Sequence, residues 1–230
     1  MVKNLHRAAF CLIAGALVVS SPVALAQPEK LKVSEEAVST AYFTALPFRE
    51  SPFADLRGVH PIMRAKAMAQ NHFRFEYDGE GRPIRVTFLL GDTPRPLNDH
   101  TDNFFFQTPR VDIFYEEGRE TRRFFDEHGN PAKMRGVFRE VYELDHLGYR
   151  QRLTFYNSDG ERIENSWGIA EYVWVIEKDG LVIEDHFNLA GEVVPKRPNL
   201  PFMRLRLHYG PAGWLAGAHG KLRDRERPRE

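Results

Sequence analysis

Apolar and polar side chains alternate along most of the chain with a period of two residues. For example, Leu153 and Phe155 fall on one face of their segment, whereas Arg150 and Arg152 fall on the other. Alternation that includes aromatic and β-branched residues is typical of strands that bury one face. The chain is therefore predicted to be mostly β, and its β region spans residues 72–210.

Glycines end the polar turns between these strands at an even spacing. Asp or Asn earlier in a turn bonds the backbone two residues on, and glycine accepts the positive φ that closes the turn. The spacing predicts a repeat of about 31 residues in which each unit is a hairpin, and successive hairpins pair into an antiparallel meander. The two series are Gly129, Gly160 and Gly191, and Gly118, Gly148 and Gly180.

The segments on either side of the β region carry different patterns. Residues 27–71 are predicted to be helical or irregular, with a short N-terminal helix over Ser34–Leu46, because serine can cap it and proline follows it. Residues 62–71 fit a helix or a strand, and analogy with the repeat favours the strand. Residues 211–230 are predicted to be a docking segment or short helix that ends in a charged tail.

One predicted strand departs from the alternating pattern. The stretch Ile169–Glu177 is apolar on both faces, which is typical of a strand that is covered on both sides. We expect the N-terminal helix to cover one face and curled connections to cover the other.

The first 26 residues have the layout of a secretory signal peptide. Lys3 and Arg7 precede the apolar stretch Ala8–Val19, and Ala24-Leu25-Ala26 forms an A-x-A cleavage signal before Gln27. The apolar stretch is shorter than the ~20 residues of a membrane span. We therefore expect cleavage after Ala26, a periplasmic or secreted protein, and no membrane span after cleavage.

Charge and cysteine content limit the partners and the kinds of site that the chain is expected to have. The chain has 32 Lys plus Arg and 32 Asp plus Glu, so its formal net charge is zero. This balance does not favour binding to nucleic acid or to an anionic surface. Cys11 is the only cysteine and lies in the apolar stretch of the signal peptide. The mature chain is therefore expected to form no disulfide, thiolate metal site or cysteine nucleophile.

Histidines beside aspartates are the candidates for a metal site or a general base. His100 and Asp102, two residues apart, are the first candidates for metal ligands. The pairs Asp145-His146 and Asp185-His186 occupy different points of the repeat, and neighbours on a strand point to opposite faces. Solvated turn residues are the favoured interpretation, and no cofactor is expected. Because the Gly-x-Ser-x-Gly and His-Glu-x-x-His motifs are missing, no catalytic residue is assigned.

Binding candidates come from arginines that share a strand face and from tryptophans beside glycine. Paired cations suit an acidic polymer or a phosphate surface, but cross-strand pairing with Glu is their commoner role. Most aromatic residues are expected to be buried, and the two tryptophans are expected to be exposed. The candidates are Arg150 with Arg152, Arg204 with Arg206, Trp167 and Trp214.

The repeat resembles that of bacterial exported proteins with tandem YD-like or WG-like β-repeats. The shared phrase is an aromatic pair followed by Asp-x-x-Gly-x-Pro, as in residues 124–131, and it recurs in part in residues 77–83 and 167–172. The resemblance covers residues 72–210, although the last unit lacks the acidic turn residue. It implies a β-sheet scaffold in the cell envelope or outside the cell, without catalytic residues.

Together these features favour an exported, non-enzymatic β-repeat protein that binds another protein or a cell-wall glycan. One alternative is a hydrolase-like periplasmic enzyme that uses dispersed Asp and His residues. A second alternative is a carrier of a small apolar ligand in a curled sheet, with a cavity lined by Phe104–Phe106. A pocket that joins two carboxylates favours the enzyme, and a continuous apolar cavity favours the carrier.

Overall fold

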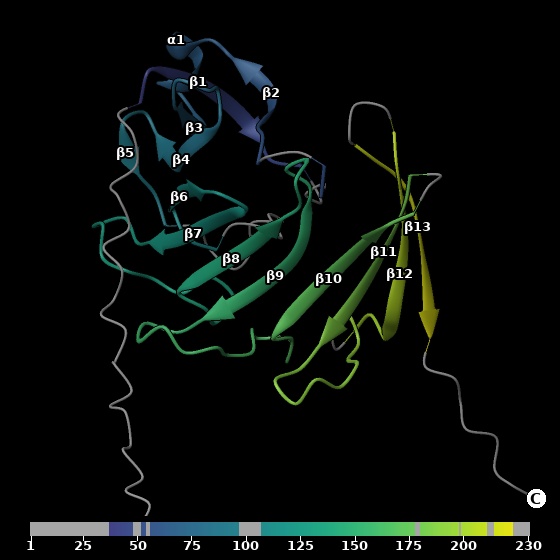
Figure 1. Ribbon diagram of the computed structural model, residues 1–230. Helices are drawn as coiled ribbons and strands as arrows, with labels where there is room; N and C mark the ends of the chain where they lie inside the picture. The colour runs from purple at the N-terminus through teal and green to yellow at the C-terminus, as the bar shows by residue number, and fades with distance from the viewer. Residues whose placement is uncertain are drawn as a thin grey trace, which may run out of the picture. The chain divides into compact units, whose positions relative to one another are not determined.

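An antiparallel sheet organises the part of the chain that the structure describes (Figure 1). The computed structural model describes residues 37–47, 52–53, 56–96, 107–177, 180–197, 199–210 and 214–222, all within the unit Val33–Glu230. The elements are β1 (Ser39–Ala45), β2 (Val59–Ile62), α1 (Arg64–Ala67), β3 (Asn71–Tyr77), β4 (Pro83–Leu90), β5 (Thr93–Pro94), β6 (Arg110–Glu116), β7 (Arg119–Phe125), β8 (Arg139–Leu144), β9 (Arg150–Tyr156), β10 (Glu171–Ile176), β11 (Leu181–Phe187), β12 (Phe202–Tyr209) and β13 (Leu215–Leu222).

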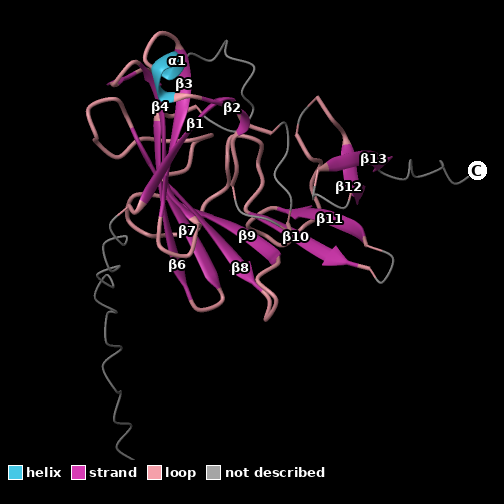
Figure 2. Ribbon diagram, turned by 90° about the horizontal axis from the view of Figure 1, so that it is seen from above, coloured by secondary structure: helices cyan, strands magenta, loops and turns pink. Residues whose placement is uncertain are grey.

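Strand order follows chain order over most of the sheet. The order is β13-β12-β11-β10-β9-β8-β7-β6-β4-β3-β1-β2, and β5 pairs with β4. From β6 to β13 each strand pairs with its successor, and Figure 2 shows β6 to β11 side by side. The mostly β, antiparallel meander predicted from the sequence is therefore confirmed.

One face of the sheet carries the apolar core, and we call it the core face. Cross-strand register places Phe75, Val111, Phe124, Leu153 and Leu205 on this face, and each side chain is buried. The opposite face carries many charged side chains that pair across neighbouring strands. This division is what the alternation of apolar and polar residues predicts.

The turns that begin the connections after β7, β9 and β11 have the chemistry that their sequence predicts. Asp126, Asn157 and Asn188 each accept, through Oδ1, the backbone N–H of the residue four positions later, at 2.8–2.9 Å. The glycine within each turn, such as Gly160 with φ +84°, adopts the left-handed backbone that other residues reach only with strain. The side-chain hydrogen bond and the glycine together reverse the chain within a few residues.

Short and long connections alternate along the meander. Tight turns join β6 to β7, β8 to β9 and β10 to β11, whereas longer loops join β7 to β8, β9 to β10 and β11 to β12. Because neighbouring strands are antiparallel, the three long loops lie at the same end of the sheet. Backbone hydrogen bonds such as Ala132 N–H to Phe124 O, at 2.9 Å, hold each loop back along its own strand. We call these three loops the end loops; they comprise residues 126–138, 157–170, 188–197 and 199–201.

The N-terminal helix predicted over residues 34–46 is wrong for the described part of that segment. Ser39–Ala45 forms β1, which pairs with β3 and places Phe43 opposite Phe73. The Phe43 ring packs edge-on against Phe75, with ring centroids 5.1 Å apart. Aromatic side chains gain more from this tertiary pairing than a capping serine contributes to a short isolated helix.

The strand predicted over residues 62–71 is interrupted by helix α1, which the sequence interpretation did not favour. The helix is a single turn in which Ala67 N–H donates to Met63 O at 3.1 Å, and Ala67 is fully buried. Its Arg, Ala and Lys residues have high helix propensity, which outweighs the analogy with the repeat. No helix in the described part of the chain combines the length and hydropathy that crossing a bilayer requires.

Two further expectations about the sheet need correction. Residues 215–222 form strand β13 rather than a helix, because a Gly- and Ala-rich segment can pair through its backbone without any alternation of side chains. The stretch 169–177 is not covered on both faces, because Val175 is 53% exposed on the opposite face. The segment that was expected to form a covering helix over this stretch instead contributes strand β1 to the same sheet.

Candidate functional site

A cleft with a volume of about 260 Å³ lies on the core face of β8 to β13. The strands supply its floor, and Pro52 and the end loops supply its walls. Its lining is mainly apolar and aromatic, with four cations and two carboxylates. The lining residues are Pro52, Met134, Arg135, Glu140, Tyr142, Arg150, Leu153, Phe155, Asn165, Trp167, Tyr172, Trp174, Glu184, Lys196, Arg197, Leu200, Phe202, Leu205, Leu207, Leu215 and Ala218.

Three aromatic side chains from β8 and β10 stack on the cleft floor. Tyr142 of β8 and Tyr172 of β10 both lie opposite Leu153 of β9, which places their rings on the core face. The Trp174 ring stacks near Tyr142, with centroids 6.3 Å apart and planes 12° apart, and near Tyr172, with centroids 6.0 Å apart. The stack presents a broad, flat apolar surface to any ligand in the cleft.

A buried cluster of charged side chains lies at one end of the floor. Glu120 Oε1 accepts a hydrogen bond from Arg122 Nε at 2.7 Å, and its Oε2 accepts one from Arg150 Nη2 at 2.8 Å. Both guanidinium groups lie over the Tyr142 ring, at 4.7 and 4.6 Å from its centroid. Arg150 lines the cleft and also a second hollow of about 300 Å³ beside the β6–β7 and β8–β9 turns. Because the carboxylate is held from both sides, the cluster fixes the position of the Tyr142 ring.

A second buried carboxylate, Glu184 of β11, also lines the cleft. It accepts hydrogen bonds from Trp174 Nε1 at 2.7 Å and from Lys196 Nζ at 2.9 Å. His186 Nε2 lies 2.8 Å from Glu184 Oε1, and the Lys196 ammonium lies over the Tyr172 ring at 4.3 Å. Glu184 therefore orients both the indole of the stack and a cation from the third end loop.

The end loops bring two arginines to one tryptophan at the wall of the cleft. Arg135 of the first loop and Arg197 of the third lie over the ring of Trp167 in the second, at 4.4 and 5.8 Å from its centroid. A two-residue turn, Arg135-Gly136, presents the first arginine, and both of its residues have positive φ. Met134 and Val137 exchange backbone hydrogen bonds at 2.8 and 3.1 Å across this turn, which is the geometry of a tight hairpin.

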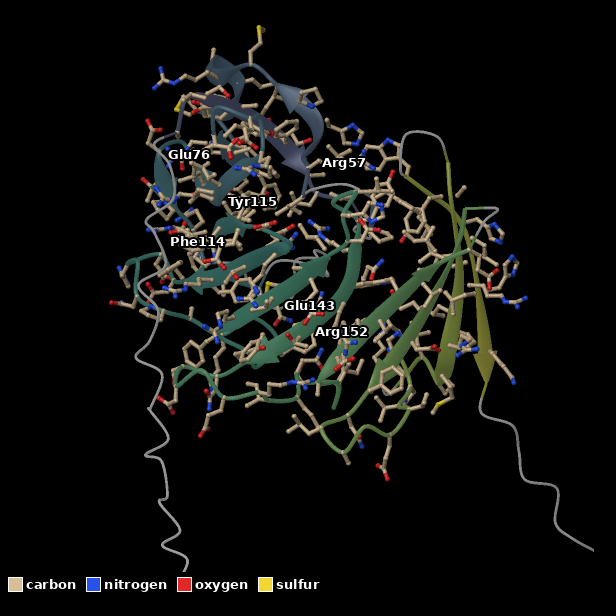
Figure 3. The ribbon with its side chains drawn as sticks, in the orientation of Figure 1. Arg57, Glu76, Phe114, Tyr115, Glu143 and Arg152 are labelled. Carbon is tan, nitrogen blue, oxygen red and sulfur yellow. The ribbon has the colours of Figure 1, made fainter. Side chains whose placement is uncertain are left out.

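The predicted pair Arg150 and Arg152 does not share a face. The register between β8 and β9 shifts between Glu143 and Leu144, so the bulge turns Arg150 onto the core face. Arg152 stays on the opposite face and pairs with Glu143 at 3.2 Å (Figure 3). It also pairs with Glu171. The prediction of one basic patch from this pair is wrong, because strict alternation does not hold through a bulge.

The other predicted arginine pair lies away from the cleft. Arg204 donates from Nε and Nη2 to Asp185 at 2.7 Å each, and this bond raises the pKa of the guanidinium. Arg206 also lies on the opposite face, because Leu205 and Leu207 on either side of it line the cleft. Arg204 therefore pairs across strands with an acid, although with Asp185 rather than with the Glu expected from the sequence.

The predicted tryptophans differ in exposure and in place. Trp167 is half-buried at the cleft wall, whereas Trp214 is 42% exposed and lies against Arg57, whose Cζ is 3.7 Å from its ring centroid. Of the two, only Trp167 lines the cleft. The expectation that both tryptophans are exposed is therefore wrong for Trp167, because the arginines of the neighbouring loops lie over its ring.

The metal-site candidates His100 and Asp102, and the stretch Phe104–Phe106, lie outside the described residues. Within those residues, no group of three or more His, Cys, Asp or Glu side chains is arranged to hold a metal ion. Asp185 and His186 point to opposite faces, as the sequence predicts, since one bonds Arg204 and the other faces Glu184.

Sequence reasoning missed most of the cleft, above all Arg135, Lys196, Arg197 and Glu184. Arg135 and Arg197 each lie ten residues after the aromatic residue that ends a strand, at Phe125 and Phe187. Counting forward from those aromatic residues into the loops would have found both arginines. Glu184 carries no such signal, because an acid within a strand normally faces solvent.

Comparison with models of known protein families finds no match for this sequence, and comparison with curated proteins finds none that is significantly similar.

Proposed function

We propose that the chain is an exported, non-enzymatic binding protein of the bacterial cell envelope, and that its cleft holds a small, largely apolar ligand. The observation that carries this proposal is the aromatic floor of a cleft of about 260 Å³. Small-molecule sites are concave and mainly apolar, with a few polar groups that fix orientation. The volume suits a ligand of one or two rings or a short acyl chain.

The polar groups in the cleft support binding by a preformed site. Glu120 is held by Arg122 and Arg150, and Glu184 is held by Trp174 and Lys196. Side chains that are already fixed lose little conformational freedom when a ligand arrives, which favours affinity. The charged groups therefore act as supports for the aromatic floor.

Export and repetition belong to the proposal and are supported mainly by the sequence. The A-x-A signal before Gln27 favours cleavage after Ala26 and a periplasmic or secreted protein. Equivalent loop hydrogen bonds, accepted by Phe124, Phe155 and His186, support a repeat of about 31 residues. A scaffold like that of the YD-like or WG-like repeats fits both features, with a protein or cell-wall glycan as an alternative occupant of the site.

A hydrolase-like enzyme is the second candidate function, and one observation favours it. Glu140 and Glu184 both line the cleft, as a pair of catalytic carboxylates would. The Glu184 carboxylate, however, is bonded to a lysine and an indole, which supports a structural role. If glycan oligomers are cleaved and Glu140→Gln abolishes the cleavage, the enzyme replaces the binding protein as the conclusion.

Titration with N-phenyl-1-naphthylamine, a neutral apolar fluorophore, tests the proposed function. We expect saturable binding with one site per chain. Ala218→Trp fills the cleft from β13 and should weaken binding by tenfold or more, whereas His219→Trp adds the same ring on the opposite face and should leave it unchanged. Binding that does not saturate, or that both variants weaken equally, would contradict a ligand site in this cleft.

A further inference from the structure

We infer that the ligand carries an anionic group, which Arg135 and Arg197 hold at the end-loop side of the cleft. The inference rests on the proposed function of the cleft and names the chemical class of its ligand. That class is an amphiphile with an apolar body and one carboxylate, phosphate or sulfonate group.

The cleft lining has an excess of positive charge. Four cations line the cleft against two carboxylates, so the described lining has an excess of two positive charges. Adding Glu120 and Arg122, which lie behind Arg150, adds one charge of each sign and leaves the excess unchanged. The chain as a whole has no net charge, so this excess is a local property of the cleft. In a mainly apolar cleft, low dielectric strengthens the attraction between such an excess and an anion.

Most of the cations that line the cleft come from the end loops. Arg135, Lys196 and Arg197 all come from the end loops, and Lys196 is paired with Glu184. Arg135 and Arg197 converge on Trp167, so two guanidinium groups from different loops concentrate positive charge at one wall. Guanidinium groups bind carboxylate and phosphate through two parallel hydrogen bonds, which makes arginine the usual choice for such groups.

The backbone of Arg135 has a strained conformation. Its φ of +50° places a residue with a side chain in the left-handed region, where a Cβ is strained by about 1–2 kcal/mol. Neighbouring contacts hold the turn: Ser166 N–H donates to Arg135 O at 2.8 Å, and Gln107 Oε1 accepts from Arg135 N–H at 3.1 Å. Strain of this kind persists mainly at functional positions, and here it presents a guanidinium group to the cleft.

An apolar part of the cleft lining, which would hold the apolar body of the ligand, extends away from these arginines. Lys196 N–H bonds Phe202 O at the start of β12, so the third end loop meets that strand at its beginning. Leu207 lies five residues further along β12, roughly 16 Å away at the rise of a strand. Together with Leu215 of β13 it lines the cleft, so apolar side chains extend the lining away from the end loops. A ligand with its anion at the end loops would therefore lay its apolar body over the aromatic stack toward Leu207.

A matched pair of fluorophores separates the charge from the apolar body. 8-Anilinonaphthalene-1-sulfonate has the same ring system as N-phenyl-1-naphthylamine and adds one sulfonate. We expect the sulfonate to bind roughly tenfold tighter or more, because hydrogen bonds to a charged group have that magnitude. The difference should shrink as salt concentration rises.

Substitutions assign that difference to the two arginines. Arg135→Asn removes the charge and retains a residue that tolerates positive φ, and Arg197→Gln removes the second charge. Each should weaken sulfonate binding at least fivefold and change binding of the neutral probe less than twofold. Arg206→Gln removes an equal charge from the opposite face and should change neither.

The outcomes separate the two proposals. If neither probe binds saturably, the cleft is not a ligand site and both proposals fail. If the neutral probe binds and the sulfonate binds no tighter, or if the arginine variants retain the sulfonate preference, only the anionic class is overturned. Competition identifies the natural head group: stronger displacement of the sulfonate by decanoate indicates a carboxylate, and stronger displacement by decyl phosphate indicates a phosphate. Equal displacement by decanol would also overturn the anionic class.

Discussion

Arg150 on β9 donates hydrogen bonds from Nε and Nη2 to one oxygen of Glu120 on β7, at 3.2 and 2.8 Å, across the strand between them. The guanidinium group spans β8 by lying over the ring of Tyr142. Arg122 takes the other carboxylate oxygen, and all three charged side chains are almost fully buried. The cluster therefore ties three strands together beneath the aromatic floor of the cleft.

Loss of the Glu120 carboxylate should destabilise the protein strongly. Glu120→Gln leaves Arg122 and Arg150 buried without their counter-charge, and breaking a buried pair in this way costs about 3–5 kcal/mol. Urea denaturation measures the change in the free energy of unfolding. Glu143→Gln removes a carboxylate from a half-exposed pair with Arg152 and should cost about 0–1 kcal/mol. Equal losses in the two variants would show that burial of the Glu120 cluster is unimportant.

The ion pairs of Asp112 should make stability depend on pH in the acid range. Burial alone would raise the pKa of Asp112, but hydrogen bonds from Arg110 and Arg85, at 2.9 and 2.7 Å, outweigh it and hold that pKa below its usual value. A depressed carboxylate pKa stabilises the fold above the unfolded-state value of about 4, and this stabilisation is lost as the pH falls further.

Asp112→Asn provides the comparison for that pH dependence. At neutral pH we expect it to lower the free energy of unfolding by roughly 1–2 kcal/mol, since the arginines are partly exposed. Below about pH 4 the difference from the wild type should shrink, because Asp112 is then protonated in the unfolded state before it is protonated in the folded state. If the difference in the free energy of unfolding between the two proteins stays constant or grows from pH 5 to pH 2, the ion pairs of Asp112 are not the source of the pH dependence.

Two glycines in the β3–β4 turn should respond differently to alanine. Gly81 has φ +79°, so Gly81→Ala forces a Cβ into the left-handed region and should cost about 1–2 kcal/mol. Gly79 has no positive φ, and a Cβ there meets no atom within 4 Å. Gly79→Ala should therefore be neutral or stabilising by about 0.4–1 kcal/mol, through a less flexible unfolded chain. Thermal denaturation of both variants checks this contrast.

Arg135→Asn should raise stability while it weakens binding of an anion. Asn-Gly is the preferred pair for a two-residue turn in which both residues have positive φ, so the variant relieves strain at the turn. We expect a gain of about 0.5–1 kcal/mol in the free energy of unfolding. Arg135→Val, with a β-branched side chain at the same φ, should lower stability. A loss of stability in both variants would mean that the arginine side chain itself holds the loop.

Export should be visible as a change in mass. Expressed at its full length in a bacterium, the protein should appear in the periplasm or medium with its N-terminus at Gln27. Ala24→Asp with Ala26→Asp removes the small residues of the cleavage signal and should leave the precursor intact. Intact mass spectrometry distinguishes the two forms, and an uncleaved wild-type chain would contradict the signal peptide.

The correct and incorrect predictions follow from how far each interaction reaches along the chain. The turns at Asp126, Asn157 and Asn188 depend on contacts within five residues, and the sequence predicted them. The pairing of β1 with β3 depends on Phe43 meeting Phe73 and Phe75, which lie 30 and 32 residues further along the chain. Local capping signals pointed to a helix instead. The bulge that turns Arg150 inward likewise has no signal within its own strand.

By itself, the sequence determined a meander of antiparallel strands with one apolar face, because alternation and turn chemistry act between near neighbours. Only the tertiary structure decided that the end loops lie together and bring Arg135 and Arg197 to Trp167. The reason is that a binding cleft depends on side chains from strands and loops far apart in the chain. Their meeting is set by sheet register and by the bulge at β9, which no local pattern encodes.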